Sequence, residues 1–325
     1  MVAADDASAR WPHVPPGRGH YESYYLRAVH PTEPRGVWIR YTVTVPPGGS
    51  PAGQLWFTLF DRSASGNRAV RVDVGEPGIG LGDEWIQFGN SGFGAARIAG
   101  EARSDACSAS WSLRYRSNEA PLLHLPRSWM YRGRLPRTKL VSLSPAAVFE
   151  GAIEVDGERI DVDGWPGMIG HNWGEQHAQQ WIWLSGLGFD GRGSDSWLDV
   201  AVGRVRVGRV TTPWIANGAL SLNGIRLPLG GLGRRVSVTA ADDGCALQIP
   251  GSGGTVTATA SAPPEAFVEW DYANPDGAVH RVLNCSVADL ALTVTPRGGA
   301  PLELGSAGRA AYEVGRATDD APPPA

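Results

Sequence analysis

Side chains that can transfer protons, donate hydrogen bonds and stack are concentrated in one stretch, residues 168–184, with the sequence MIGHNWGEQHAQQWIWL. Imidazole, carboxylate and amide groups can exchange protons or hydrogen bonds with a ligand, and indole rings can cover an apolar or cationic one. No other window of the chain gathers these residue types so densely. The candidate functional residues in this stretch are His171, Asn172, Trp173, Glu175, His177, Trp181 and Trp183.

Acid-catalysed hydration or cyclisation of an olefin is a reaction that these residue types can support. An acid protonates the double bond, and π faces or carboxylates stabilise the cation that forms. The candidate acids are His171, Glu175 and Asp271, provided that burial raises a carboxyl pKa or a carboxylate keeps the imidazole protonated. The predicted pocket walls are Trp173, Trp181, Trp183 and Tyr272.

Structural roles compete with these catalytic ones. His171 is equally well explained as a core histidine bonded to the backbone, and Asp271 as the cap of a turn at Asn274-Pro275. A divalent metal held by His171, Glu175 and His177 would need a helix or tight loop to bring the three together. A glycine interrupts their spacing, so no metal site is predicted.

Two further pairs are candidates for substrate binding. Glu22 and Tyr24 are two residues apart on a predicted strand, so they share a face and either reach the pocket or cap a barrel end. His280 and Asn284 also share a strand face, where a structural hydrogen bond competes with ligand binding. The glycine-rich run 78–82 lacks the helix and the acidic residue of a dinucleotide site, so no cofactor is predicted.

Composition excludes several classes of function. The net charge of −4 argues against a nucleic-acid partner, because phosphate binding needs a basic excess or stripe. No segment approaches the roughly 20 apolar residues that span a bilayer, and the N-terminus lacks a secretory pattern. The three cysteines match neither a zinc site nor a redox pair. We expect a cytoplasmic protein whose partner is an apolar small molecule.

The fold is predicted to be all-β with little helix. Gly 43 and Pro 25 make turns frequent, and short apolar–polar alternations such as residues 37–45 recur at intervals of about ten residues. The dipeptides Asp156-Gly157 and Asn223-Gly224 predict tight hairpins. Single helical turns are predicted at residues 175–180 and 301–311, and the proline-rich segment 117–145 is predicted to be a long loop or lid beside a cleft.

Hairpins on both sides of residue 180 predict two similar β units. We expect an N-terminal β-sandwich or barrel domain over residues 1–178 and a C-terminal β-barrel domain over residues 179–316. Residues 317–325, ATDDAPPPA, are expected to form a disordered tail.

Several motifs resemble those of the two-domain lipocalin-like proteins. They are Gly170-His171-Asn172-Trp173-Gly174, Trp181-Ile182-Trp183, Tyr21-Glu22-Ser23-Tyr24-Tyr25, Trp270-Asp271-Tyr272 and Leu283-Asn284-Cys285-Ser286. That group contains carotenoid 1,2-hydratases, tocopherol cyclases, AttH-like proteins and certain decalin-forming Diels–Alderases. The motifs are spread over nearly the whole chain, so the resemblance covers both predicted domains.

The resemblance implies two lipocalin-like domains and a pocket, between or within them, for a terpenoid or polyketide olefin, without a redox cofactor. The chain departs from the pattern at two positions. Gly170 stands where carotenoid hydratases have an acidic residue, and His171 where tocopherol cyclases have lysine. Three hypotheses remain open: a cofactor-independent hydratase, cyclase or isomerase; a non-catalytic carrier of a lipid or pigment; and a structural protein with a vestigial pocket.

Overall fold

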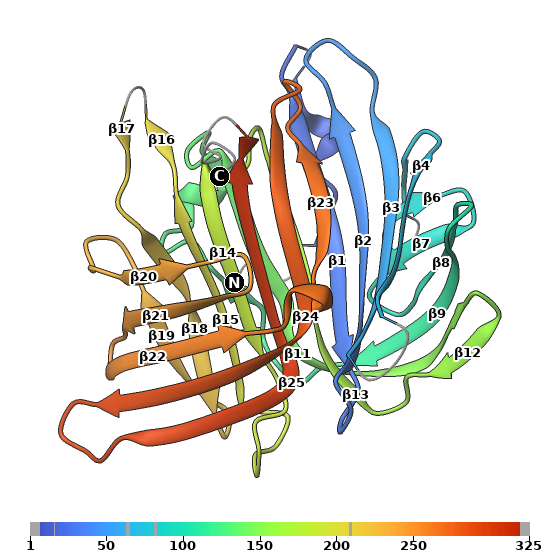
Figure 1. Cartoon of the computed structure of the whole chain (residues 1–325). Coiled ribbons are helices and arrows are strands. Elements are labelled where there is room, and N and C mark those ends of the chain that lie inside the picture. The colour runs from blue at the N-terminus through green and yellow to red at the C-terminus, as the bar shows by residue number, and fades with distance from the viewer. Residues whose placement is uncertain (1–6, 16, 63–65, 81–82, 208–209, 319–325) are drawn as a thin grey trace.

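The structure is a computed structural model that describes residues 7–15, 17–62, 66–80, 83–207 and 210–318, and it is almost entirely β (Figure 1). Two large antiparallel sheets curl side by side, which confirms the predicted fold class. The first has the strand order β4-β3-β2-β1-β13-β11-β9-β8-β7-β6-β5, with β10 and β12 paired to β11. The second has the order β19-β18-β15-β14-β25-β24-β22-β21-β20, with β23 paired to β24.

The strands of the first sheet are β1 (His20–Val29), β2 (Arg35–Val45), β3 (Ala52–Asp61), β4 (Arg68–Val74), β5 (Gly78–Ile79), β6 (Glu84–Phe88), β7 (Ser91–Gly94), β8 (Ile98–Arg103), β9 (Ser108–Arg116), β10 (Leu122–Leu123), β11 (Thr138–Val155), β12 (Glu158–Asp161) and β13 (Trp165–Gly174). Those of the second are β14 (Gln180–Gly186), β15 (Trp197–Arg204), β18 (Ile215–Leu222), β19 (Ile225–Gly230), β20 (Ser237–Ala240), β21 (Gly244–Pro250), β22 (Gly254–Ser261), β23 (Val268–Ala273), β24 (Val279–Pro296) and β25 (Leu302–Ala317). The remaining elements are the ribbon of β16 (Arg206–Val207) and β17 (Val210–Thr211), the short helix α1 (Trp129–Arg132), and the single turns η1 (Trp11–His13) and η2 (Pro264–Ala266).

Both predicted tight hairpins form. Asp156 and Gly157 join β11 to β12, with φ of 52° and 84°. Asn223 and Gly224 join β18 to β19, with φ of 50° and 77°. Positive φ at both central residues is the backbone that a two-residue hairpin needs, and asparagine, aspartate and glycine adopt it most readily.

Three local predictions were wrong. Residues 175–179 form no helix, because the backbone N–H of His177 is taken by the side chain of Asn274 and β14 begins at Gln180. Residues 302–311 belong to β25, since this long strand pairs with β24. The loop predicted up to residue 145 ends at Thr138, where β11 begins; Pro145 lies at a bulge in that strand, between Ser144 and Ala147. A bulge accommodates proline because its missing N–H is not needed there.

β1 is the strand that places the site, because all ten of its residues are buried. Successive side chains of a strand point to opposite faces. Tyr24 and Leu26 pack in the core of the first sheet, whereas Tyr25 packs on Trp183 of the second sheet. Arg27 also faces the second sheet, where its Nη2 donates to the backbone oxygen of Ser286 at 2.9 Å.

The chain passes from one sheet to the other between Gly174 at the end of β13 and Gln180 at the start of β14. One apolar core fills the curl of the first sheet, and a second fills the curl of the other sheet and continues onto Trp38, Trp56 and Phe60 of the first. None of the helices in the described ranges is long or apolar enough to cross a membrane. The tail predicted from residue 317 begins too early, because Ala317 is the last residue of β25 and pairs with His280. Residues 319–325 lie outside the described residues.

Candidate functional site

A cavity of about 230 Å³ lies between the two sheets. Its walls come from β1, β2, β13 and the 124–140 segment on one side, and from β14, β15, β18 and β25 on the other. Its apolar and aromatic lining includes Tyr21, Tyr25, Trp38, Met130, Leu140, Trp181, Ile182, Trp183, Val202, Ile215 and Tyr272. Its polar lining is Arg40, His124, Thr138, Asn172, His177, Asn217 and Glu313. A mostly apolar cleft with a few convergent polar groups is the usual form of a small-molecule site.

Glu313 is the one carboxyl group among these lining residues. Its Oε1 accepts a hydrogen bond from Trp181 Nε1 at 2.9 Å. Its Oε2 accepts from Asn284 Nδ2 at 2.8 Å and from the Tyr272 hydroxyl at 3.2 Å. The side chain is 8% exposed. Three uncharged donors therefore hold this carboxyl group in place at the wall of an apolar cavity.

His177 is held as a neutral imidazole beside the same cavity. Its ring stacks on Tyr21 with the centroids 4.0 Å apart, and its Nδ1 lies 2.7 Å from Asn274 Oδ1. An amide oxygen only accepts, so Nδ1 carries the proton and Nε2 carries a lone pair. Burial, with the nearby charge of Arg40, lowers the pKa of His177 to about 3. Nε2 is buried and makes no hydrogen bond within the described part of the protein.

A second polar network lies on the other side of the cavity lining, at His124. The His124 Nε2 atom is 3.0 Å from Ser142 Oγ, which in turn donates a short hydrogen bond to Asp199 Oδ2. The other Asp199 oxygen accepts from Trp183 Nε1 at 2.9 Å. His124 Nδ1 lies 3.1 Å from the backbone oxygen of Asn217, so this network ties the 124–140 segment to the second sheet.

Two glycines make room for the aromatic walls. A Cβ at Gly170 on β13 would lie 2.2 Å from Tyr25 Cζ, and a Cβ at Gly315 on β25 would lie 2.1 Å from Trp181 Cζ2. Real Cβ atoms do not approach other carbons so closely, so each ring rests flat across a glycine. The glycine in place of an acidic residue at position 170 is thus the reason that Tyr25 can cover that strand.

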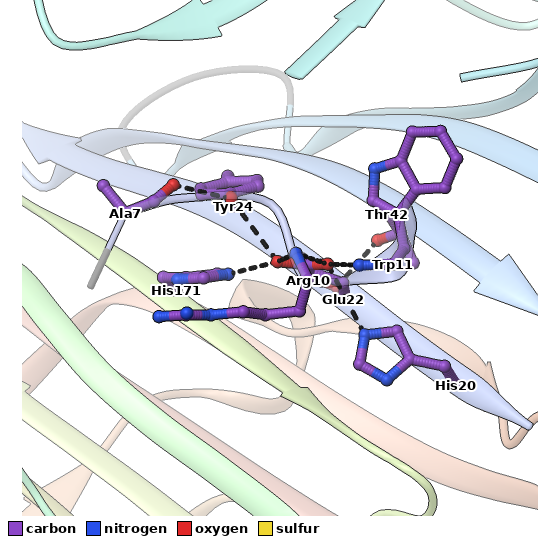
Figure 2. A network of polar contacts seen from close by, with 9 residues as sticks. Ala7, Arg10, Trp11, His20, Glu22, Tyr24, Thr42 and His171 are labelled. Atoms are coloured by element: carbon purple, nitrogen blue, oxygen red, sulfur yellow. Dashed lines mark hydrogen bonds and ion pairs between the residues drawn. The ribbon is translucent and has the colours of Figure 1, made fainter. Parts of the chain in front are cut away.

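His171 does not line this cavity and lies instead in the core of the first sheet, as Figure 2 shows. Its Nε2 is 2.8 Å from Glu22 Oε1, and its ring stacks on Tyr24 with the centroids 4.2 Å apart and on Trp173 at 4.6 Å. The Glu22 carboxylate also accepts the backbone N–H groups of the 10–11 segment. Glu22 and His171 are both fully buried.

The hydrogen bonds of this cluster stabilise the ionised form of Glu22. Burial alone would raise the pKa of Glu22, but hydrogen bonds from His171 and His20 outweigh it and lower the pKa to about 2. The hydrogen-bonding capacity of the buried Glu22 carboxylate is already used within the protein, so none is left for a ligand. The geometry therefore favours the core-histidine alternative for His171, with the Glu22 carboxylate as its partner.

The structure brings together some of the predicted residues and separates others. The cavity is lined by Asn172, His177, Trp181, Trp183 and Tyr272, and Asn284 lies behind it as a donor to Glu313. The core of the first sheet holds Glu22, Tyr24, His171 and Trp173. Glu175 forms ion pairs with Arg18 and Arg134, and Asp271 is an exposed residue on the edge of a second cavity.

The separation of His171 from Asn172 has a simple cause. Both lie on β13, where neighbouring side chains point to opposite faces. If residues 168–174 had been predicted to form a strand, the alternation of side chains between its two faces would have separated His171 from Asn172. In the described ranges no group of three or more His, Cys, Asp and Glu side chains could hold a metal ion.

Sequence reasoning missed Arg40, Glu313 and His124. Arg40 and Glu313 share a recognisable signal, since each is a charged residue flanked by apolar or aromatic neighbours, in Trp38-Ile39-Arg40-Tyr41 and in Ala311-Tyr312-Glu313-Val314. A charge is costly to bury, so such a position indicates a polar site on one strand face. His124 lies among prolines and apolar residues and gives no comparable signal.

Comparison with known proteins supports the fold. No family model matches the chain. An uncharacterised protein of Mycobacterium tuberculosis, found in two strains, is 27% identical over 326 residues, which cover 98% of this chain and 96% of the relative.

Solved structures with the same architecture align with nearly the whole chain. Kievitone hydratase from Nectria haematococca matches with a TM-score of 0.58 and 10% identity, over 98% of this chain and 93% of its own. CghA bound to Sch210972 matches with a TM-score of 0.58 and 12% identity, over 92% and 89%. A Nitrosomonas europaea protein assigned provisionally to AttH matches with a TM-score of 0.52 and 14% identity, over 96% and 95%. The predicted resemblance to two-domain lipocalin-like proteins is thus confirmed in the fold.

Proposed function

We propose that the protein is a cofactor-independent hydratase, cyclase or isomerase that acts on an apolar olefinic molecule, a terpenoid or a polyketide, in the cavity between the sheets. The observation that carries this proposal is Glu313, the one carboxyl group lining an aromatic cavity and the acceptor of three hydrogen bonds. The shared architecture with a protein named kievitone hydratase supports the same class of reaction.

Glu313 replaces His171, Asp271 and Glu175 as the proposed acid. In its protonated form it gives its proton to one olefinic carbon, and the other carbon becomes cationic. The hydrogen bonds from Trp181, Tyr272 and Asn284 stabilise the carboxylate as negative charge develops on it. The π faces that line the cavity stabilise the cation.

The fate of the cation decides the reaction class. In hydration, water adds to the cationic carbon, and the proton that it loses passes to a base. His177 Nε2 fits this role, because it is a buried lone pair on a ring that lines the cavity and is unprotonated near neutral pH. In cyclisation a second double bond of the substrate attacks the cation instead, and the ring cation that forms loses a proton from a neighbouring carbon to Glu313, which restores the acid. In isomerisation a neighbouring carbon returns a proton to Glu313.

The test is incubation of the protein in D2O with a panel of linear terpenoids, prenylated phenols and polyketide polyenes, followed by mass spectrometry of the products. A product that has gained the elements of D2O marks hydration. One that has gained deuterium without oxygen marks cyclisation or isomerisation. Quenching of tryptophan fluorescence by the same compounds reports binding separately.

Glu313→Gln removes the transferable proton while keeping the size of the side chain. We expect turnover to fall by on the order of 10²–10⁴-fold, with ligand quenching retained. Glu303→Gln is the matched control, because Glu303 is exposed on the same strand. Unchanged turnover in E313Q would remove Glu313 from the mechanism. If the wild type binds a compound tightly but no compound gives a labelled product, the enzyme hypothesis is wrong and the carrier hypothesis takes its place.

A further inference from the structure

A second cavity, of about 280 Å³, adjoins the first. Four side chains line both cavities and form the boundary between them: Tyr21, Arg40, His177 and Tyr272. The rest of its lining includes the polar side chains of Thr42, Thr44, Gln54, Arg71 and Asp271, beside Trp56 and two alanines. The two cavities thus meet at one guanidinium group.

Arg40 is a buried cation without a charged partner. It is 4% exposed, and its Nη2 donates to Ser23 Oγ at 2.8 Å. Its guanidinium carbon lies over the ring of Tyr272, 4.2 Å from the centroid, and 5.7 Å from that of Trp56. Its Nε is buried and makes no hydrogen bond, and no carboxylate in the described ranges forms an ion pair with it.

A guanidinium in this state favours an anionic ligand. Burial of an unpaired charge is costly, and an oxygen acceptor replaces the hydrogen bonds to water that the guanidinium loses on burial. Arginine also presents a planar fork of donors that matches a carboxylate. The two carboxyl groups that line the cavities form no ion pair with Arg40: Glu313 accepts three hydrogen bonds from other residues, and Asp271 is exposed to solvent.

Charge at the mouth of the second cavity points the same way. Arg71 lies over Trp56, 4.9 Å from the ring centroid, and its Nη1 donates to the backbone oxygen of Asp271 at 3.2 Å. The second cavity is therefore lined by two arginines, and neither forms an ion pair with a carboxylate in the described part of the chain.

We propose that the ligand is amphiphilic, with its olefinic part in the first cavity and an anionic oxygen group, a carboxylate or an enolate, against Arg40 at the boundary. The placement of the olefinic part rests on the proposed function. The anionic group is an independent addition, because it derives from Arg40 and the second cavity. By anchoring one end of the molecule, the anionic group would set the position of the double bond relative to Glu313.

The test uses three probes with one hydrocarbon chain: farnesoic acid, its methyl ester and farnesol. Their dissociation constants are measured for the full-length protein at pH 7.5 by tryptophan quenching and by calorimetry. We expect the acid to bind at least tenfold more tightly than the ester and the alcohol. In R40M the acid should bind no more tightly than the ester and the alcohol, and R40K should retain part of the preference. R114Q is the matched control, because Arg114 is exposed on β9.

The outcomes separate the two proposals. Equal affinities of the wild type for all three probes overturn the anionic group and leave the apolar cavity intact. If none of the three binds, the olefin site of the proposed function falls, and the amphiphile falls with it. If R40M does not fold, the comparison of the three probes on the wild type still decides, and a retained preference in R40K assigns it to the charge at this position.

Discussion

Replacing Glu22 with glutamine should lower the free energy of unfolding by about 3 kcal/mol at neutral pH. The fall of the Glu22 pKa from 4.5 to about 2 corresponds to that amount of stabilisation of the ionised carboxylate. The side chain is fully buried, so solvent does not screen it. In E22Q an amide N–H group would also face the N–H groups of Arg10 and Trp11, and His171 would lose its charged partner.

The pH dependence follows from the direction of the pKa change. A carboxylate whose pKa is lower in the folded protein contributes its full stabilisation above the unfolded value, near 4.5. That contribution is lost as the pH falls from about 4.5 towards 2, because the unfolded chain then binds the proton while the folded carboxylate is still ionised. The gap in stability between wild type and E22Q should therefore be constant above about pH 5 and narrow below it.

Urea denaturation, followed by tryptophan fluorescence between pH 4 and pH 8, measures this gap. Glu154→Gln is the matched control, since Glu154 is exposed on β11 of the same sheet, and it should change stability by less than about 0.5 kcal/mol. An E22Q protein as stable as the wild type at pH 7 would refute the reasoning. So would a gap that widens as the pH falls. The same logic predicts that His171→Ala lowers stability.

Two other perturbations test the cavity. Because burial lowers the pKa of His177 from 6.5 to about 3, the unfolded chain binds this proton more tightly, and stability should fall below about pH 6.5, by about 1.4 kcal/mol at pH 5.5. His177→Gln should remove that part of the acid slope in urea titrations, and an unchanged slope would contradict a buried neutral His177. Gly170→Ala should displace the Tyr25 ring, destabilise the protein by about 1–3 kcal/mol and weaken ligand quenching, whereas Gly78→Ala on β5, whose Cβ would meet nothing nearer than 3.6 Å, should do neither. Normal quenching by G170A would show that Tyr25 does not shape the cavity.

Local sequence was sufficient for the elements whose cause is local. Asp156-Gly157 and Asn223-Gly224 make their hairpins because only a few residue types adopt positive φ readily, so the turn type is decided by the dipeptide. The helical turn predicted at residues 175–180 failed because its competitor is distant. Asn274, about a hundred positions away, supplies the hydrogen bond that holds His177 in an extended connection.

The sequence by itself determined that the protein is all-β and that three of its tryptophans lie beside several polar groups at residues 168–184. Only the tertiary structure decided which side of each strand meets the other sheet. That choice sent His171 to a closed core and Asn172 to the cavity, and it brought Glu313 to Trp181 and Arg40 to Tyr272. The physical reason is that strand alternation is a local property, whereas the partner of each face is set by the packing of two sheets from distant parts of the chain.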